Sequence, residues 1–489
     1  MVFSGWTLSG RCDERSAKTA QPSKNDPSSP LLDMAERFVT FCSSLHGLFR
    51  TLTGNAAPQA TIYLHGLFQA RLHAKNMERM EEAVAGADYD RLHHFISDSP
   101  WQALPVMDHV AREVSHLLDG PMALLYIDKT CFTKKGGHSV GVARQYNGRA
   151  GKTDNCQVAV FAALGRGDRA CLAGARLYLP EEEWCRDPAR CEKAGIPPEA
   201  RVFKTKATLA LELVAHLRET GAGFSATVLD AGFGKNPTLL RALDDAREVF
   251  VADLHRTQQI WTNDPWPVVP AGGKKGRPPT VPRAAHPPLT VQAWAGALPD
   301  KAWQTVALRP GTKGEIRVQY VHQRVYLWNG EEATARLWHL VARRTLDLHG
   351  QPDEISWTLS NAGAGTRGAG IVAMACSRYF IERSFQDAKS TPGLADYQTR
   401  GWLGWHHHVA LVMLAMLFQL RGRMVHADEY PLLSSADIVE LLRHFLPAGA
   451  ITREEVHQQM QVRHRKRQAS IDSAYRRQAP LEEPPERLL

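Results

Sequence analysis

Two short apolar runs, each ending on an aspartate, constrain the fold of this chain more than any other feature of its sequence. Residues 122–128 are MALLYID and residues 224–230 are FSATVLD, and neither run has a helical period. Runs of this length are typical of buried strands. Helical patterns at 208–219 and about 237–246 surround the second run, and a third strand is expected at 248–254. Strands that alternate with helices predict a mixed α/β core.

The rest of the 489 residues divides by composition into segments around this core. Residues 1–30 are polar and rich in Ser, Pro and Lys, which is typical of a flexible leader. Apolar residues at three- and four-residue spacing, such as Phe38, Phe41 and Leu45, predict an N-terminal helical domain. The expected segments are the leader, this helical domain, the first part of the α/β core, a basic loop with a β-rich insertion, the helices that complete the core, and a basic tail, at residues 1–30, 31–120, 121–260, 261–370, 371–450 and 451–489.

The second half of the chain begins with a stretch that is not expected to pack. Within residues 262–300, AGGKKGRPPTVPRAAHPPLT is full of Pro and Gly and has four basic residues and no acidic one, so we expect a mobile basic loop. Alternation within 302–360 predicts strands inserted into the core. Helices are expected at about 371–390 and 402–421, and the residues around RHRKRQ (463–468) are expected to form a disordered tail.

Composition narrows the class of protein and of partner. A hydrophobic fraction of 44% and a charged fraction of 22% indicate a globular protein, and a net charge of +8 favours a polyanionic partner such as nucleic acid. None of the eight cysteines forms a CxxC pair, which argues for reduced thiols and against a structural zinc site. The first residues lack the apolar core of a signal peptide, and the longest apolar run, 409–420, is too short to span a bilayer. We therefore expect a buried helix there, in a protein that acts in the bacterial cytoplasm at the nucleoid.

Asp128, Asp230 and Glu382 are the candidate catalytic and metal-binding residues. Both aspartates end apolar strands, whose carboxyl edge faces a crevice in an α/β sheet, and Glu382 lies on a late helix. Three carboxylates at close range repel one another unless divalent cations lie between them. Two Mg²⁺ ions about 3.5–4 Å apart, with Mn²⁺ as a substitute, would activate a water or hydroxyl and stabilise the leaving oxygen of a phosphodiester. The competing interpretation is that both aspartates are turn formers or helix caps and that the glutamate is solvated.

The late helix carries two cations beside the glutamate. Arg378, Glu382 and Lys389 are separated by four and seven residues, so all three lie on one face of a helix. A carboxylate flanked by two cations on a largely buried helix suits a metal ligand beside phosphate contacts. The alternative is a surface ion pair of little energetic value.

Four segments of the chain carry the motifs of a known family. They are LHHFISDSPW and the stretches around the three acidic residues, at residues 92–101, 126–160, 228–243 and 378–411. These segments resemble the DDE transposases of the insertion-sequence 701 family, which is similar to the insertion-sequence 4 group. The resemblance implies an RNase H-like mixed sheet with a β-rich insertion, preceded by an N-terminal helical domain that binds DNA. It also implies that Asp128, Asp230 and Glu382 are the catalytic acidic residues.

The insertion-sequence 4 group has a Tyr-Arg-Glu-Lys signature, which this chain matches in part. Arg378, Glu382 and Lys389 fit the last three positions, but Ala375 stands at the tyrosine position. The resemblance implies that Arg378 and Lys389 lie near the phosphates of the transposon end, and that one phosphate contact of the family is missing.

The second acidic segment also departs from the family pattern, because Asp230 is followed by Ala231 and Gly232 where relatives have polar residues. Relatives also place a tryptophan of the insertion against a flipped base. The candidates here share only their place in or near the insertion, and burial in a β-rich core is the alternative for each: Trp261, Trp303 and Trp328.

Other basic residues are candidates for DNA contact. Lys134 and Lys135 follow the first catalytic strand and would line the DNA path or end a solvated hairpin. Lys274, Lys275 and Arg277 precede two prolines, a pattern that suits a narrow minor groove or, with less specificity, phosphates. The three consecutive histidines at 406–408 point apart on a helix and are interpreted as packing or surface residues.

Three functions remain open on the sequence. The first is a cut-and-paste transposase that cleaves double-stranded DNA at terminal inverted repeats and transfers the ends to target DNA, with a hairpin as one route and a homodimer as the synaptic form. The second is a catalytically silent, host-retained DNA-binding protein on the same fold. The third is a host nuclease that hydrolyses DNA without joining it. The intact acidic set favours the first over the second, since binding alone does not need three repelling carboxylates.

Overall fold

The computed structural model of the chain describes residues 31 and 33–478, except for 53, 149, 272–278, 312–313, 348–349 and 449–451. The expected leader therefore lies outside the described residues. The strands are β1 (Arg50–Thr51), β2 (Gly54–Asn55), β3 (Leu124–Thr133), β4 (Ala143–Asn147), β5 (Lys152–Arg166), β6 (Arg169–Leu177), β7 (Ala226–Leu229), β8 (Phe250–Leu254), β9 (Gln259–Ile260), β10 (Leu289–Thr290), β11 (Gln304–Gly311), β12 (Gly314–Leu327), β13 (Arg336–Thr345) and β14 (Ser356–Ser360). The α-helices are α1 (Met34–Ser44), α2 (Ala57–Gln69), α3 (Met77–Ala83), α4 (Tyr89–Ser97), α5 (Ala103–Leu117), α6 (Pro188–Lys193), α7 (Lys206–Glu219), α8 (Ala231–Gly234), α9 (Pro237–Asp245), α10 (Val291–Gly296), α11 (Gly368–Cys376), α12 (Tyr379–Ser390), α13 (Trp402–Val425), α14 (Ser435–Phe445) and α15 (Arg453–Gln478).

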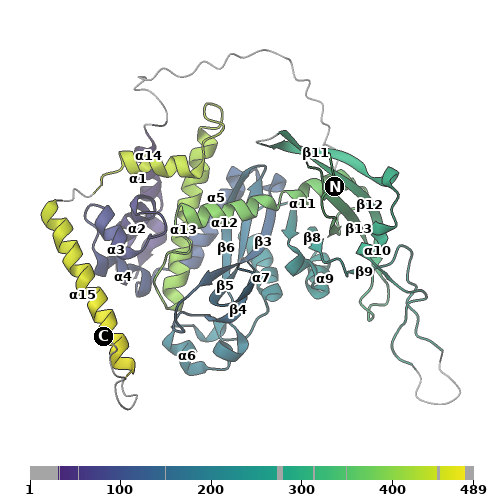
Figure 1. Cartoon of the computed structure of the whole chain (residues 1–489), viewed down its shortest axis with the longest axis horizontal. Coiled ribbons are helices and arrows are strands. Elements are labelled where there is room, and N and C mark those ends of the chain that lie inside the picture. Colours follow the sequence, from purple (N-terminus) through teal and green to yellow (C-terminus); the bar gives the residue numbers. More distant parts are fainter. Residues whose placement is uncertain are drawn as a thin grey trace, which may run out of the picture.

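A ten-stranded mixed sheet forms the centre of the molecule (Figure 1). Its order is β11-β12-β13-β14-β8-β7-β3-β5-β4, and β6 pairs with the second half of β5. β7 runs parallel to both β3 and β8, while the other pairs are antiparallel. The predicted mixed α/β core is thus present.

The strand that carries Asp128 is longer than the apolar run that predicted it. β3 continues through Asp128 to Thr133, because residues 128–133 remain paired with β5. The parallel ladder between β3 and β7, in contrast, ends at Ile127 and Leu229. Asp128 therefore marks the end of the parallel ladder and not the end of its strand.

The helices between the parallel strands begin at capping residues. Thr205 accepts a hydrogen bond from the Thr208 amide at the start of α7, and Asn236 does the same for the Leu239 amide at the start of α9, where Pro237 occupies the first turn. α7 connects β6 to β7 and α9 connects β7 to β8. These crossovers keep β3, β7 and β8 parallel, so their carboxyl ends share one edge of the sheet.

The β-rich insertion extends the same sheet. β14 pairs antiparallel with β8, and β13, β12 and β11 follow outward. Directly after the segment expected to form a mobile loop, which ends at residue 290, α10 forms and buries Val291 and Trp294, which pack into the common core. Thr290 caps this helix through the Ala293 amide. Residues 272–278 lie outside the described residues.

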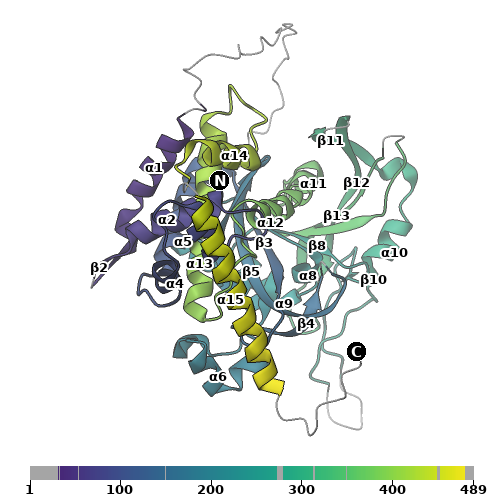
Figure 2. The same ribbon diagram turned by 60° about the vertical axis from the view of Figure 1, so that its left-hand side comes forward.

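The long helix α13 lies between the sheet and the N-terminal helices, as Figures 1 and 2 show. It packs against β6, against α5, which also contacts β6, and against α2 and α4. Its length and composition would allow it to cross a membrane, but 78% of its most apolar window is buried inside the protein. The predicted buried helix at 409–420 thus agrees with the structure.

Two C-terminal elements differ from expectation. The helix predicted at 371–390 is broken into α11 and α12 at Ser377, whose hydroxyl accepts a hydrogen bond from the Tyr126 hydroxyl (3.0 Å) and donates one to the Met374 carbonyl (2.6 Å). The tail expected to be disordered contains α15. Its cations pair with the acidic helix α3, as in Arg463–Glu82 (2.5 Å).

The histidines of α13 are packing residues, as predicted for the buried pair. His407 stacks on Trp101 with ring centroids 3.7 Å apart, and its two nitrogens contact the Ile96 and Trp101 carbonyls. His408 contacts the Tyr63 hydroxyl at 2.9 Å. Burial lowers the pKa of His407 from 6.5 to about 4 and that of His408 to about 3. Both rings are neutral in the folded protein and join the N-terminal helices to α13.

The stability of the fold should fall on acidification because of these rings. The unfolded chain takes up protons near pH 6.5, while His407 in the fold takes one up only near pH 4. Stability is therefore lost as the pH falls through this window, by about 1.4 kcal/mol per pH unit for each such histidine. Urea denaturation at pH 7, 6 and 5 measures the slope.

The variant His407→Gln should show a shallower loss of stability between pH 6 and 5 than the unmodified chain, whatever its stability at pH 7. His94→Gln is the matched control, because the His94 side chain is 70% exposed and its removal should leave the slope unchanged. Equal slopes for all three proteins would contradict the assignment.

Candidate active site

Three aspartates lie at the same level of three adjacent parallel strands. Ile127 pairs with Leu229, and Leu229 pairs with Ala252, so the next residue along each strand is an aspartate: Asp128, Asp230 and Asp253. Parallel strands present equivalent positions at one edge, which brings these carboxylates side by side. The structure thus brings Asp128 and Asp230 together as predicted and adds Asp253, which the sequence analysis did not select.

Asp128 is the most electrostatically strained of the three. Burial, followed by repulsion from Asp230, raises its pKa to about 6. The Lys129 amide, which donates to Asp128 Oδ1 at 2.7 Å, and the charges of Arg378 and Lys129 offset this only in part. A carboxylate held in such surroundings is stabilised by added positive charge.

Asp230 has two partners. It caps the short helix α8, its Oδ1 accepting a hydrogen bond from the Phe233 amide at 2.9 Å, and its Oδ2 lies 3.7 Å from the Lys129 ammonium. Asp230 therefore does cap a helix, as the competing interpretation predicted. Its other carboxylate oxygen, Oδ2, lies near a cation.

One of the glycines after Asp230 has a steric reason. A Cβ on Gly232 would lie 2.6 Å from the Lys129 ammonium nitrogen, and a Cβ on Gly234 would lie 2.0 Å from the Asp253 carbonyl oxygen. The Lys129 side chain is flexible and can move aside, whereas the Asp253 carbonyl is backbone, so α8 packs so closely on β8 that a larger side chain does not fit at Gly234.

Glu382 lies on α12, above the face of the sheet that carries Asp128. Asp128 is paired with Phe161 of β5, and the Phe161 ring packs edge-on against Phe385 of α12, with centroids 5.5 Å apart. The Glu382 side chain is 53% exposed, and its Oε1 lies 2.8 Å from Arg378 Nη1. The ion-pair alternative thus describes Glu382 in this structure, on a helix that packs over β5.

Arg378 connects the helix to the sheet. Besides Glu382, its Nε lies 3.7 Å from Asp253 Oδ2, and its charge lowers the pKa of Asp128. Asp253 is itself held by Arg343, at 2.9 and 3.1 Å, and by the Thr358 hydroxyl at 2.8 Å. A third apolar run ending on an aspartate, at 250–253, is the signal by which the sequence could have revealed Asp253.

The remaining signature positions are explained by packing. The Lys389 ammonium donates to the Thr130 hydroxyl at 2.5 Å, two residues beyond Asp128 on the same strand face. Ala375 is buried, so a tyrosine there would have to displace the core between α11 and the sheet. Tyr379 is half exposed, and the centre of its ring lies 4.8 Å from the Arg309 guanidinium.

The other predicted DNA contacts are scattered. The Lys134 ammonium lies 3.6 Å from the centre of the Tyr397 ring, and burial lowers its pKa to about 8; Lys135 is exposed. Lys274, Lys275 and Arg277 lie outside the described residues.

The tryptophans of the insertion divide into packed and exposed ones. Trp261 is buried and packs edge-on against Trp328, while Trp303 lies 4.1 Å from the Arg344 guanidinium. Trp266, which the sequence analysis did not select, is 67% exposed and has a left-handed backbone with φ of 44°.

The donor chemistry of the site fits divalent cations. Asp128 and Asp230 are adjacent, mutually repelling carboxylates, and hard cations such as Mg²⁺ prefer such oxygen ligands. Within the described ranges, no three Asp, Glu, His or Cys side chains form a ready-made metal-binding group. The Glu382 carboxylate is paired with Arg378.

Comparison with known proteins gives two matches. Residues 47–315 match the family model described as DDE superfamily endonuclease, a span that includes all three aspartates and ends before Glu382. The chain is also 27% identical over 235 residues to a protein of Microchaete diplosiphon named "Probable transposase for insertion sequence element IS701". That alignment covers 48% of this chain and 57% of the relative.

Replacing Asp128 by asparagine should stabilise the protein in the absence of divalent ions. The substitution removes a buried charge whose pKa is raised to about 6, which corresponds to about 1–3 kcal/mol at pH 8. Thermal unfolding in EDTA measures the change. Asp428→Asn, at an exposed position, is the control and should leave the melting temperature unchanged. A less stable Asp128→Asn variant would contradict this electrostatic description.

The close contact of α8 with β8 predicts a large effect of one methyl group. Gly234→Ala should destabilise the protein by about 1–3 kcal/mol, because the Asp253 carbonyl is backbone and cannot rotate away. Gly370→Ala is the matched control: it lies in α11 with nothing near its Cβ position and should be neutral or stabilising by up to about 1 kcal/mol. Urea denaturation measures the free energy of unfolding of both variants. Equal changes in the two would contradict the close contact at Gly234.

Proposed function

This chain belongs to the DDE superfamily of endonucleases, and from that premise we propose that it is a transposase, which cleaves double-stranded DNA at transposon ends and transfers the freed ends to target DNA. The observation that carries the proposal is the alignment of Asp128 and Asp230 at the carboxyl edge of the β3–β7 ladder, with Glu382 on the helix above. The relative named as a probable insertion-sequence transposase supports it.

An RNase H-like core is part of this proposal. Three antiparallel strands, β6, β5 and β3, are followed in the sheet by β7 and β8, which are parallel to β3. This arrangement supports the fold that the sequence resemblance implied. The insertion then extends the β8 edge, and the N-terminal helices, which we propose to bind DNA, pack against α13 on the other side.

Asp128, Asp230 and Glu382 would hold two Mg²⁺ ions, or Mn²⁺ in their place. When bound, such ions supply an activated water or hydroxyl and stabilise the leaving oxygen of the phosphodiester. Lys129 already places positive charge beside Asp230, at 3.7 Å, and would limit the repulsion within the carboxylate pair.

Arg378 and Lys389 would bind the phosphates of the transposon end. Both lie on or beside α12, on the face that covers β3, where Lys389 reaches Thr130. A DNA phosphate is a bidentate acceptor for the Arg378 guanidinium and competes with Glu382 for it. Binding of DNA would in this way free the Glu382 carboxylate, so that the third acidic ligand becomes available only with the substrate in place.

The finer features of the transposition route form part of the same proposal. The substrates would be the terminal inverted repeats of the element and a target duplex, joined in a synaptic homodimer. A hairpin intermediate would need an aromatic side chain against a flipped base. Trp266 suits that role better than the three tryptophans selected from sequence, because it is the more exposed side chain.

The function is tested by cleavage of duplexes that carry the ends of the element. Asp128→Asn, Asp230→Asn and Glu382→Gln should each lower Mg²⁺-dependent nicking at least about a thousandfold, because each removes a carboxylate that positions the reacting groups. Asp387→Asn is the matched control on α12, since Asp387 pairs with Arg383 at 3.2 Å and should be dispensable.

Full cleavage by all three variants would overturn the proposal. Tight DNA binding by the unmodified protein without nicking in Mg²⁺ or Mn²⁺ would instead identify a silent DNA-binding protein. Cleavage without joining of pre-cut 3′-hydroxyl ends would identify a nuclease.

A further inference from the structure

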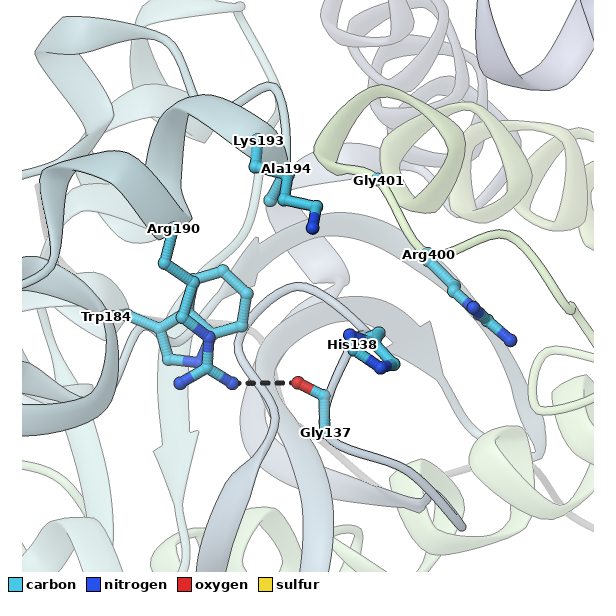
Figure 3. Close-up of a pocket in the computed structure, with 8 residues that line it drawn as sticks. All are labelled: Gly137, His138, Trp184, Arg190, Lys193, Ala194, Arg400 and Gly401. Atoms are coloured by element: carbon cyan, nitrogen blue, oxygen red, sulfur yellow. Dashed lines mark hydrogen bonds between the residues drawn. The ribbon is translucent and has the colours of Figure 1, made fainter. Parts of the chain in front are cut away.

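A cavity of about 350 Å³ lies between three segments that are far apart in the sequence (Figure 3). Gly137 and His138 come from the loop after β3, Arg190 and Lys193 from α6, and Arg400 with Gly401 from the start of α13. A larger cavity of about 980 Å³ shares Lys193 and Arg400 with it. The two adjoin at these residues and form one groove, whose larger part is also lined by Asp98, and neither is lined by the carboxylates of the candidate active site.

The smaller cavity is lined by basic side chains and by no acidic one. Lys193 and Arg400 form no ion pair with the residues that the structure describes, although carboxylates pair with many other surface cations of this chain. Figure 3 shows His138, Lys193 and Arg400 around the same space. Cations that share a cavity without a counter-ion repel one another, and an anion bound between them relieves that repulsion.

Among these basic side chains, Arg190 connects two segments of the backbone. Its guanidinium donates to the Gly137 carbonyl at 2.9 Å, which Figure 3 marks, and to the Glu183 carbonyl at 2.7 Å, and it lies 4.1 Å from the centre of the Trp184 ring. These neutral partners leave its charge uncompensated while they fix the loop after β3 against α6. The cavity is therefore held open by Arg190 and presents Lys193 and Arg400 as the available cations.

The start of α13 adds to the positive potential of the groove. Gly401 occupies the N-cap position without a side-chain acceptor for the first amides of this 24-residue helix. The Trp402 amide donates to the Ala194 carbonyl at 2.8 Å, which joins α13 to the end of α6. The buried hydroxyl of Thr399, in the lining of the larger cavity, has no hydrogen-bond partner in the described part of the chain.

The cavity is within reach of a duplex that occupies the active site. Gly137 follows Asp128 by nine residues, and nine extended residues span at most roughly 30 Å. One turn of B-DNA is about 34–36 Å long. A duplex with its scissile phosphate at Asp128 can therefore place a backbone phosphate at this groove within about one helical turn.

On this basis we propose that the groove formed by the loop after β3, α6 and the start of α13 binds the sugar–phosphate backbone of duplex DNA at a distance from the scissile bond. The inference rests on the proposed function and adds a second contact region to it. Lys193 and Arg400 supply the charge, and Arg190 positions the loop. Because these side chains meet phosphates, the contact is independent of base sequence.

The test is a binding titration with a fluorescently labelled mixed-sequence duplex several helical turns long, in EDTA and at several salt concentrations. Lys193→Gln and Arg400→Gln should each weaken binding by about tenfold and lower the slope of log K against log salt by about 0.9. Lys193→Arg should restore most of the affinity. Arg186→Gln is the matched control, since Arg186 is an exposed cation near α6 that pairs with Glu181 and Glu182 instead of lining the groove, and it should change binding by less than about twofold.

A second measurement separates this inference from the proposed function. In Mg²⁺, the DNA concentration that half-saturates cleavage should rise about tenfold for Lys193→Gln and Arg400→Gln and by less than about twofold for Arg186→Gln. Unchanged affinity and salt slope in these variants, or an effect equal to that of Arg186→Gln, would overturn the groove while leaving the proposed function intact. Failure of the unmodified protein to bind or cleave DNA would overturn the proposed function itself.

Discussion

The repulsion between carboxylates at one edge of the parallel β3–β7–β8 ladder is the constraint around which the rest of the site is built. Backbone pairing places Asp128, Asp230 and Asp253 at equivalent positions, and burial makes the charge of Asp128 costly. Each aspartate has a cation close by: Lys129 lies beside Asp230, Arg343 and Arg378 lie beside Asp253, and the charges of Arg378 and Lys129 act on Asp128. The site is thus balanced by protein cations, and a divalent ion or a DNA phosphate would enter by exchange with them.

Arg378 is central to that exchange because it holds Glu382 as well as Asp253. Its position at the break between α11 and α12 places the guanidinium between the helix and the sheet. The family resemblance implies that this arginine contacts phosphate. In the structure the same guanidinium forms an ion pair with Glu382, four positions later. A phosphate that draws Arg378 away leaves a free carboxylate beside the aspartates, which connects substrate binding to the assembly of the proposed metal site.

The helix α13 gives the molecule its second organising feature. Its buried histidines and apolar residues join the N-terminal helices to the sheet in one continuous core, so the segments expected as separate domains share their packing. Its start, in turn, borders the basic groove. The same helix therefore connects the region proposed to bind DNA with the sheet that carries the proposed catalytic carboxylates.

Local patterns in the sequence were sufficient to place Asp128 on a core strand and Asp230 directly after one. They also placed Glu382 between Arg378 and Lys389 on one helix, and a buried helix near 409–420. Strand runs and helical spacing are short-range properties, so they can be recognised without knowledge of the fold. Only the tertiary structure showed that Asp253 lies beside the other two aspartates and that Arg378 contacts both Asp253 and Glu382. It also showed that Ala375, at the tyrosine position of the signature, is buried in the core.

Three further features were also visible only in the tertiary structure: the groove, the pairing of α15 with α3, and the continuation of the central sheet into the insertion. Each depends on pairing register or on packing between segments that are widely separated along the chain, as the loop after β3, α6 and the start of α13 are in the groove. Periodicity within one segment carries no information about which distant segment lies against it. The sequence by itself therefore determined which residues are able to do chemistry, and the tertiary structure determined which charges meet.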